Sequence, residues 1–235
     1  MSEQNLDNHR SDGAFTGPLD QETFRALLFN SFLHQQDRLR ASRQEGQRLA
    51  AIADTRHAVT ESGDLRIALN LVAGRAMEIT GSTGAAIAIG SQGHMTCWAT
   101  SGPTAPPLGA PLPLDSGLSG ECLRLRRTLC CDDAGSDSRV NREACSRLGG
   151  VGSMLLVPLC RGNFAIGILE VFSTRQRAFD ESDEHALELL ALIASAAVID
   201  FAAGEAAPRV SWSVGQPSAR LLPSPPLCDG LSLRS

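Results

Sequence analysis

Hydrophobic positions recur at helical spacing through the first part of the chain. Residues 21–60 contain no Pro and are dominated by Ala, Leu, Gln, Arg and Glu, which favour a helix. Their apolar positions follow alternating steps of four and three, as in a coiled-coil seam, although the stretch Gln35–Gln47 is polar. The seam consists of Leu28, Phe32, Gln35, Leu39, Ser42, Gly46, Leu49 and Ala53. We therefore expect a long helix that acts as a dimerisation segment over residues 21–62.

A second helix is predicted over residues 65–79. One of its faces carries only apolar side chains, namely Leu65, Leu69, Val72, Ala76 and Ile79. Gly63 breaks the preceding helix, and Asp64 is suited to cap the new one. Gly81 follows as a stop signal.

Beyond residue 84 the pattern changes to short apolar runs separated by turns, which is typical of strands. The two strongest runs, Ser153–Cys160 and Phe164–Ser173, are joined by a turn at residues 161–163. An earlier pair forms a hairpin around residues 91–93. In full, we expect strands at 85–89, 94–100, 128–131, 153–160 and 164–173, a helix at 117–127, a short helix or ordered loop at 138–148, and a loop at 101–113.

The last predicted element is a helix from about Glu181 to Ala203 that is apolar nearly all round. Such a helix cannot rest on a sheet with its other face in water, so it needs a second helix from residues 21–80 or from another copy of the chain. Taken together, the elements predict an α+β fold: an antiparallel sheet of about five or six strands with flanking helices, preceded by the long N-terminal helix.

The two ends of the chain lack this periodicity. Residues 1–20 are polar, and residues 205–235 are rich in Pro, Ser and Gly. Both compositions are typical of disorder. We therefore expect one folded domain over residues 63–204, between the helical segment 21–62 and a disordered tail.

Composition excludes several kinds of chemistry. The 235 residues carry a net charge of −5, all 21 basic residues are Arg, and Lys and Tyr are absent. An acidic chain without a basic block is a poor nucleic-acid binder. Without Lys there is no Schiff-base chemistry and no Walker A site.

Seven cysteines and the absence of a signal sequence indicate a reducing compartment. The number is odd, and residues 1–18 contain no apolar core of a signal peptide. No stretch reaches the roughly 20 uninterrupted apolar residues of a membrane span. There is no C-x-x-C motif, and the adjacent Cys130 and Cys131 would point to opposite faces of a strand, so no metal site is expected. We expect a soluble cytoplasmic protein.

The second half of the chain resembles a GAF domain. The resemblance rests on Gly149–Leu159, Ala165–Val171 and Phe179–Glu184, together with the helix start Gly117-Leu118-Ser119-Gly120 and the loop from Asp133 to Arg139. It covers about residues 65–203. GAF domains are small-molecule sensor and dimerisation modules, so the resemblance implies a ligand pocket between the sheet and the helix-loop segment that precedes the last two strands.

By that resemblance the pocket is lined by parts of residues 87–98 and 114–153. The candidate ligand-binding residues are Ile89, Trp98, Leu118, Asp133, Arg139, Arg142 and Ser153. The guanidinium groups of Arg139 and Arg142 either bind a ligand carboxylate or phosphate, or form local ion pairs within the acidic loop. The sequence identifies neither the ligand nor a cofactor.

One alternative is a cysteine-dependent redox enzyme or sensor that resembles free methionine sulfoxide reductase. Cys145 lies roughly where the reactive cysteine of those enzymes lies, and Cys122, Cys130 or Cys131 would resolve it. The chain departs from the G-V-C-G helix start of those enzymes, because Ser119 takes the place of the cysteine. A second alternative is a degenerate GAF domain that serves dimerisation only.

Other members of the family match less well. Phe179, Asp183 and Glu184 fit the F-x-x-x-D-E motif of cyclic-nucleotide-binding members, but Ser173-Thr174 replaces the N-K pair. No cysteine is followed by His, which excludes the usual bilin attachment. The sequence therefore favours a non-enzymatic sensor module that binds an unidentified small ligand, forms a homodimer and acts on a partner protein, without nucleic acid, membrane or metal.

Overall fold

A computed structural model describes residues 21–91, 94–114 and 116–204. The predictions of disorder for residues 1–20 and 205–235 therefore lie outside the described residues. The chain divides into two compact units, residues 1–47 and 48–235. The division between the two units falls inside the first helix.

Two helices come first, as predicted. Helix α1 (Gln21–Glu61) buries Ile52 and Thr55, both of which belong to the second unit. Helix α2 (Leu65–Thr80) is capped by Asp64, whose Oδ1 accepts a hydrogen bond from the Ile67 amide at 2.9 Å. It ends at Gly81, which has a φ of 59°. A left-handed residue at this position favours glycine, so both end signals in the sequence are confirmed.

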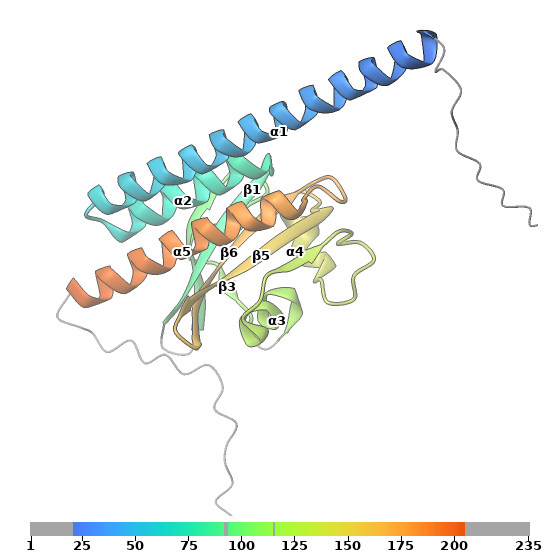
Figure 1. Cartoon of the computed structure of the whole chain (residues 1–235). Coiled ribbons are helices and arrows are strands. Elements are labelled where there is room, and N and C mark those ends of the chain that lie inside the picture. Colours follow the sequence, from blue (N-terminus) through green and yellow to red (C-terminus); the bar gives the residue numbers. More distant parts are fainter. Residues whose placement is uncertain (1–20, 92–93, 115, 205–235) are drawn as a thin grey trace, which may run out of the picture. The chain divides into compact units, whose positions relative to one another are not determined.

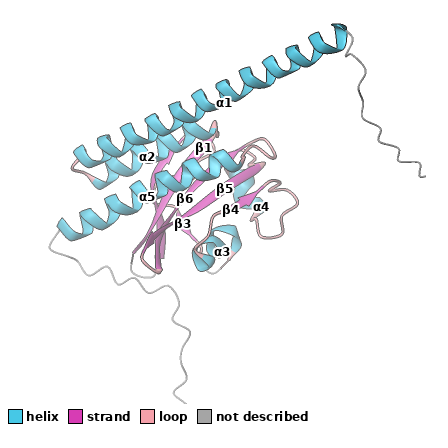
Figure 2. Ribbon diagram, in the orientation of Figure 1, coloured by secondary structure: helices cyan, strands magenta, loops and turns pink. Residues whose placement is uncertain are grey.

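The sheet has six antiparallel strands in the order β3-β2-β1-β6-β5-β4 (Figures 1 and 2). The predicted α+β class is therefore confirmed. The strands are β1 (Gly84–Ser91), β2 (His94–Ser101), β3 (Pro111–Leu112), β4 (Leu129–Cys131), β5 (Ser153–Arg161) and β6 (Phe164–Ser173). Strand β3 lies within the predicted loop 101–113, where two residues pair with Met95 and Thr96. The remaining helices are α3 (Gly117–Leu125), α4 (Arg142–Arg147) and α5 (Glu181–Gly204).

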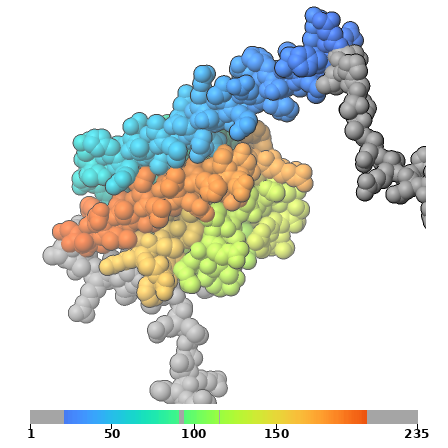
Figure 3. Space-filling view, viewed as in Figure 1, coloured from blue at the N-terminus to red at the C-terminus, as the bar shows by residue number. Residues whose placement is uncertain are grey.

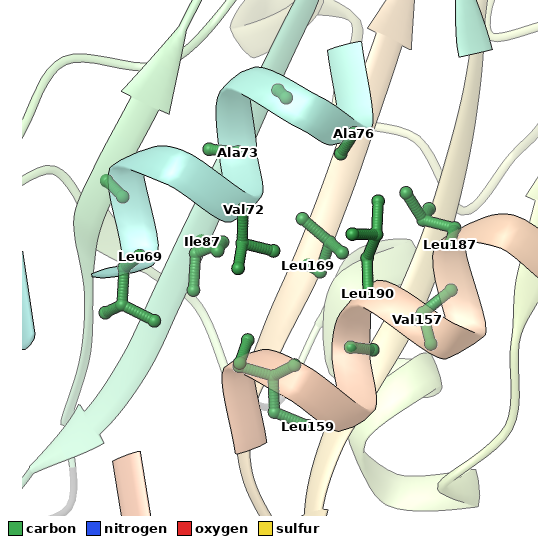
Figure 4. Packing of buried hydrophobic residues seen from close by; sticks show 14 of the residues in the cluster. Leu69, Val72, Ala73, Ala76, Ile87, Val157, Leu159, Leu169, Leu187 and Leu190 are labelled. Atoms are coloured by element: carbon green, nitrogen blue, oxygen red, sulfur yellow. The ribbon is translucent and has the colours of Figure 1, made fainter. Parts of the chain in front are cut away.

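One face of the sheet packs against α2 and α5. Figure 4 shows Val72 of α2 and Leu190 of α5 meeting Leu169 of β6 in this core. We call it the α2–α5 core; its fully buried large side chains are Leu69, Ile87, Leu155, Leu159, Ile166, Leu169, Leu187, Leu190 and Val72. Burial of each such side chain contributes on the order of 2 kcal/mol, so this core dominates the stability of the domain.

The other face packs against α3, α4 and the loops around them, which form the α3–α4 core. Its buried members are Ala86, Ala88, Met95, Cys97, Leu118, Cys122, Leu123, Cys131, Ala134, Cys145, Val151, Met154, Leu156, Ile168 and Phe172. Alternation along β1 divides the strand between the two cores, with Ile87 and Ile89 on one side and Ala86 and Ala88 on the other. Small side chains and thiols therefore gather on the α3–α4 face.

A β-bulge interrupts the alternation of β2. Ile87 pairs with Ala99 and the next residue, Ala88, pairs with Cys97, so Trp98 is the extra residue. In consequence Cys97 belongs to the α3–α4 core, whereas Ala99 belongs to the α2–α5 core and Trp98 packs against it.

Gly167 of β6 allows the two central strands to approach closely. A Cβ atom on Gly167 would lie 2.6 Å from the carbonyl oxygen of Ala88. A glycine at this point of the strand therefore leaves room for the neighbouring strand.

Helix α5 begins with a reciprocal cap that α1 reinforces. Oδ1 of Asp180 accepts hydrogen bonds from the amides of Ser182 and Asp183, and Oδ2 of Asp183 accepts one from the Asp180 amide. Arg48 of α1 pairs with Oδ1 of Asp183 at 3.0 Å and also donates to the Ser182 hydroxyl. Asp180 thus caps α5, and Arg48 links α1 to the start of α5.

Helix α5 is long and apolar enough to cross a membrane by length and composition alone, but one of its faces is buried against the sheet. Figure 3 shows one side of α5 uncovered. Helix α2 lies beside α5, as the two-faced composition of α5 required, yet Leu189, Leu192 and Phe201 of α5 stay exposed within the described chain.

Candidate functional site

The feature of greatest chemical interest on the α3–α4 face is the buried carboxyl group of Glu170. It lies in the middle of β6, paired with Ala86 on one side and Leu156 on the other, and only 4 % of the residue is exposed. The Ser119 hydroxyl at the start of α3 donates a hydrogen bond of 2.5 Å to Oε1.

Burial raises the pKa of Glu170 from 4.5 to about 7, and the hydrogen bond from Ser119 offsets only part of that rise. Among the residues that the structure describes, no Arg or His pairs with this carboxyl group. A buried acid without a cation is uncommon, because the charged form is costly in a low-dielectric interior. The protonated and the charged forms of Glu170 are therefore similarly populated close to neutral pH.

Three thiols from three different elements lie within electrostatic reach of Glu170. They belong to Cys97 of β2, Cys122 of α3 and Cys145 of α4, and the negative charge of Glu170 adds to burial in raising the pKa of each. The pKa rises to about 11 for Cys97 and to about 12 for Cys122. All three side chains are therefore uncharged thiols at neutral pH.

These pKa values argue against the thiol-enzyme alternative. A nucleophilic cysteine needs a lowered pKa and a solvent-exposed position. Cys145 is buried with a raised pKa, and the Cys122 thiol is fully buried and donates to the carbonyl of Arg127. Burial and the negative charge of Glu170 raise the pKa of Cys145, although Arg142 and Arg147 flank this residue in the sequence.

Arg139 forms a clamp between the acidic loop and α3. Its guanidinium pairs with Asp137 at 2.6 Å and with Glu121 of α3 at 3.1 Å. The hydrogen bond from Arg139 is the main reason that the pKa of Asp137 falls to about 2. Of the two sequence alternatives for this arginine, the described structure contains the local ion pair.

The other predicted polar residues are held differently. Ser153, at the start of β5, is fully buried; its hydroxyl donates to the carbonyl of Arg175 and accepts from the amide of Ala178. Asp133 stabilises its own turn by accepting from the Gly135 amide. Arg142 is exposed at the first turn of α4. Ser153 and Asp133 therefore have local structural partners already.

The predicted apolar residues do not come together. Leu118 of α3 is buried in the α3–α4 core. Ile89 and Trp98 pack in the α2–α5 core, on the opposite side of the sheet. Strand alternation accounts for Ile89, and the bulge in β2 accounts for Trp98. The expectation that Ile89 and Trp98 share one pocket with Leu118 is therefore corrected.

Glu170 was missed as a site residue, although the sequence contains a signal for it. It is the single charge within the apolar run Ala165–Phe172. A charged residue in the centre of a predicted buried strand departs from the hydrophobic pattern, and such departures are expected at functional sites.

Two other kinds of site are weaker. No group of three or more potential metal ligands occurs among the described residues, and Cys130 and Cys131 do face opposite cores, as predicted. A hollow of about 590 Å³ lies at the turn between β5 and β6, lined by Arg161, Gly162, Asn163, Phe164 and Ile166. Its lining has one charged side chain and no converging polar groups, so it does not specify a ligand.

Comparison with protein families gives a match over most of the folded domain. A family model described as "GAF domain" matches residues 62–198, which is more than half of the chain. No curated protein matches the sequence significantly.

Solved structures with the same fold come from several kinds of protein. The GAF domain of a phosphoenolpyruvate-protein phosphotransferase from Coxiella burnetii superposes with a TM-score of 0.62 at 21% identity, covering 68% of this chain and 96% of that one. A free methionine-R-sulfoxide reductase from Neisseria meningitidis has a TM-score of 0.57 at 21% identity, covering 65% and 89%. A methyl-accepting chemotaxis protein, residues 122 to 287, has a TM-score of 0.57 at 23% identity, covering 65% and 99%. At these identities the likeness shows the fold alone.

Proposed function

Because the chain belongs to the GAF domain family, whose fold serves sensing and regulation, we propose that it is a non-enzymatic sensor module that binds a small ligand on the α3–α4 face. The observation that carries this proposal is Glu170, a buried carboxyl group that pairs with no described Arg or His. A charged group in the interior is costly without a cation, so such a carboxyl group departs from what a purely structural strand requires. Of the ligand-binding residues expected from the sequence, Leu118 shares this face.

The surroundings of Glu170 are consistent with a ligand site. On this face the adjacent strand β1 carries the small side chains of Ala86 and Ala88, whereas β5, on the other side, carries Met154 and Leu156. Helix α3 contributes Ser119 and Cys122, so movement of α3 would change the environment of Glu170 directly. A ligand that favours one position of α3 over another would shift the balance between two states of the domain.

We further propose that the module acts as a homodimer through its long helices. In α1, Leu28 and Phe32 of the predicted seam and the nearby Phe24 are more than half exposed, and Leu39 and Leu49 of the seam are each 48% exposed. On α5, Leu189, Leu192 and Phe201 are exposed as well. A second copy of the chain would cover such surfaces.

The contacts of Arg48 connect α5 of the domain with α1. Arg48 lies on α1, and its partners Asp183 and Ser182 form the first turn of α5. Since the first turn of α5 directly follows β6 and its connection, a shift of the sheet would reach α1 through this ion pair. The proposed output is a change in helix packing that a partner protein reads.

Native mass spectrometry of the full chain, purified gently from a host related to its source, tests this proposal. We expect a mass of twice the 24.9 kDa chain plus a discrete small-molecule adduct. The adduct should be lost from a Glu170→Leu variant and kept in a Glu143→Leu variant, whose side chain is exposed on α4. A monomer without any adduct would contradict both the dimer and the sensor.

A further inference from the structure

The hollow at the turn between β5 and β6 includes an open edge of the sheet. Pairing between β1 and β6 ends with Ile89 and Gly167. The first residues of β6, Phe164–Ile166, therefore have no strand partner on the β1 side among the described residues. Phe164 and Ile166 also line the hollow. An edge of this kind offers main-chain donors and acceptors to an added strand.

The side chains that line the hollow suit an aromatic occupant. Phe164 is 62% exposed, whereas Ile166 is buried and belongs to the α2–α5 core. Arg161 brings a guanidinium group to the lining, and such a group stacks readily on an aromatic ring. The volume of about 590 Å³ has room for a large side chain. An aromatic ring in the hollow would cover Phe164 and stack on Arg161.

Helix α5 directs the chain that follows it toward this end of the sheet. The Ala178 amide, just before α5, donates to the Ser153 hydroxyl at the start of β5. The Cys160 amide, near the end of β5, donates to the Ser195 hydroxyl at 3.2 Å. Helix α5 therefore runs beside β5 in the same direction, toward the β5–β6 turn. From Ser195 it continues for about 14 Å to its end at Gly204.

The chain beyond α5 contains a segment with the sequence pattern of a short strand. Val210, Trp212 and Val214 alternate with serines, so an extended segment would carry all three apolar side chains on one face. Trp212 is the only aromatic residue in the sequence 205–235. It lies eight residues beyond the end of α5, and eight extended residues span up to about 27 Å. This length is sufficient to bring Trp212 to the hollow.

We propose that the segment Val210–Val214 docks in the hollow of its own chain, with Trp212 covering Phe164 and stacking on Arg161. The segment adds to the open edge of β6 through main-chain hydrogen bonds. Because the connection from α5 is short, the segment is present at a high effective concentration, and a weak contact is sufficient. The inference goes beyond the proposed function and does not depend on it, since Glu170 faces the other core.

Tryptophan fluorescence of the full chain tests the inference. The chain has two tryptophans, so Trp212 is the sole emitter in a Trp98→Phe background. We expect its emission to lie at shorter wavelength than that of a synthetic peptide of residues 205–220, and to be quenched less by acrylamide, because docking shields the ring from water. Phe164→Ser should move the emission to that of the peptide. Leu108→Ser changes a similarly exposed side chain in a loop and should have no effect.

Hydrogen exchange gives a second measurement that leaves Trp98 in place. We expect the amides of residues 161–166 to exchange about tenfold more slowly in the wild type than in Trp212→Ser, because docking pairs the open edge and excludes water. Leu221→Ser changes another apolar residue beyond α5 and serves as the control. Its exchange over residues 161–166 should equal that of the wild type.

Three results would overturn the inference. The first is equal exchange of residues 161–166 in the wild type and Trp212→Ser. The second is shielded emission of Trp212 that Phe164→Ser leaves unchanged, because the ring would then be covered elsewhere. The third is shielding that is lost on dilution, which would assign the hollow to the segment of a second copy of the chain.

Discussion

At the scale of single residues, the burial of Glu170 couples the stability of the domain to pH. The pKa of this carboxyl is about 7 in the folded state, above its ordinary value of 4.5. Between these pH values the folded chain binds more protons than the unfolded chain. The contribution of Glu170 to stability is therefore full below pH 4.5 and is lost as the pH rises through 7.

We expect the free energy of unfolding of the wild type to fall by about 3 kcal/mol relative to Glu170→Gln between pH 4 and pH 8. The reason is that Gln keeps the shape of the protonated acid and cannot ionise. Urea unfolding followed by circular dichroism at several pH values measures this difference, with Glu143→Gln as the surface control. Parallel curves for wild type and Glu170→Gln would refute the assignment.

Arg139, a candidate ligand-binding residue, already forms ion pairs within the domain. Its ion pairs with Asp137 and Glu121 join the acidic loop to α3. Because the side chain of Arg139 is 40% exposed, the clamp contributes only about 0–1 kcal/mol. Asp137 contributes this stability above its ordinary pKa of 3.8, and the contribution is lost as the pH falls toward 2.

In an Arg139→Gln variant we expect the pKa of Asp137 to return toward 3.8. Nuclear magnetic resonance titration of the aspartate carboxyl carbons reports this change. Arg147→Gln is the matched control, because Arg147 pairs with Glu143 on the exposed side of α4. If Asp137 titrates identically in wild type and Arg139→Gln, the clamp does not exist in solution.

At the scale of the elements, a buried ion pair between Arg48 and Asp183 links α1 to α5. The side chain of Asp183 is 6% exposed, and Arg48 is the partner of its Oδ1. Burial is the main cause that raises the pKa of Asp183, and Arg48 works in the opposite direction. Removal of Arg48 would leave a buried carboxylate without its cation.

We expect Arg48→Ala to destabilise the domain by about 3 kcal/mol at pH 7 and by less at pH 4, where Asp183 can take up a proton. A double-mutant cycle with Asp183→Asn, measured by urea unfolding, isolates the pair. The double variant should recover part of the loss. Additive effects of the two substitutions would mean that the residues do not interact.

Two glycines give opposite predictions for the same substitution. A Cβ on Gly167 would collide with the Ala88 carbonyl oxygen at 2.6 Å in the centre of the sheet, whereas a Cβ on Gly74 of α2 would meet nothing within 4 Å. Gly167→Ala should lower the free energy of unfolding by about 2 kcal/mol, through strain between β1 and β6. Gly74→Ala should raise it by about 1 kcal/mol, since Ala is the better helix former. Thermal unfolding of both variants checks the pair, and equal effects would contradict the described register.

At the scale of the whole molecule, the prediction concerns assembly. The apolar side chains of α1 between Phe24 and Leu39 are exposed among the described residues. We expect light scattering to give a mass of about twice 24.9 kDa for the wild type and about one chain for Leu28→Asp combined with Phe32→Asp. The control Leu108→Asp changes an equally exposed leucine in a loop and should leave the dimer intact. A monomeric wild type would remove the dimer from the proposed function.

Much of the architecture was predictable because it depends on local pattern. The cap at Asp64, the stop at Gly81 and the hairpin of β5 and β6 follow from signals within a few residues of each feature. The two-faced composition of α5 also predicted a helical neighbour, which is α2. The short β3 was missed because two residues carry too little periodicity to be recognised.

The sequence by itself determined the class of fold, the order of its elements and the family, since these rest on hydrophobic periodicity and on motifs that are continuous in the chain. Only the tertiary structure decided which side chains share a face. The bulge at Trp98 reverses the alternation of β2, and Glu170 meets Ser119 across 51 residues of chain. Burial, and with it the pKa of Glu170, depends on these long-range contacts, because a charge is costly only where the folded chain excludes water.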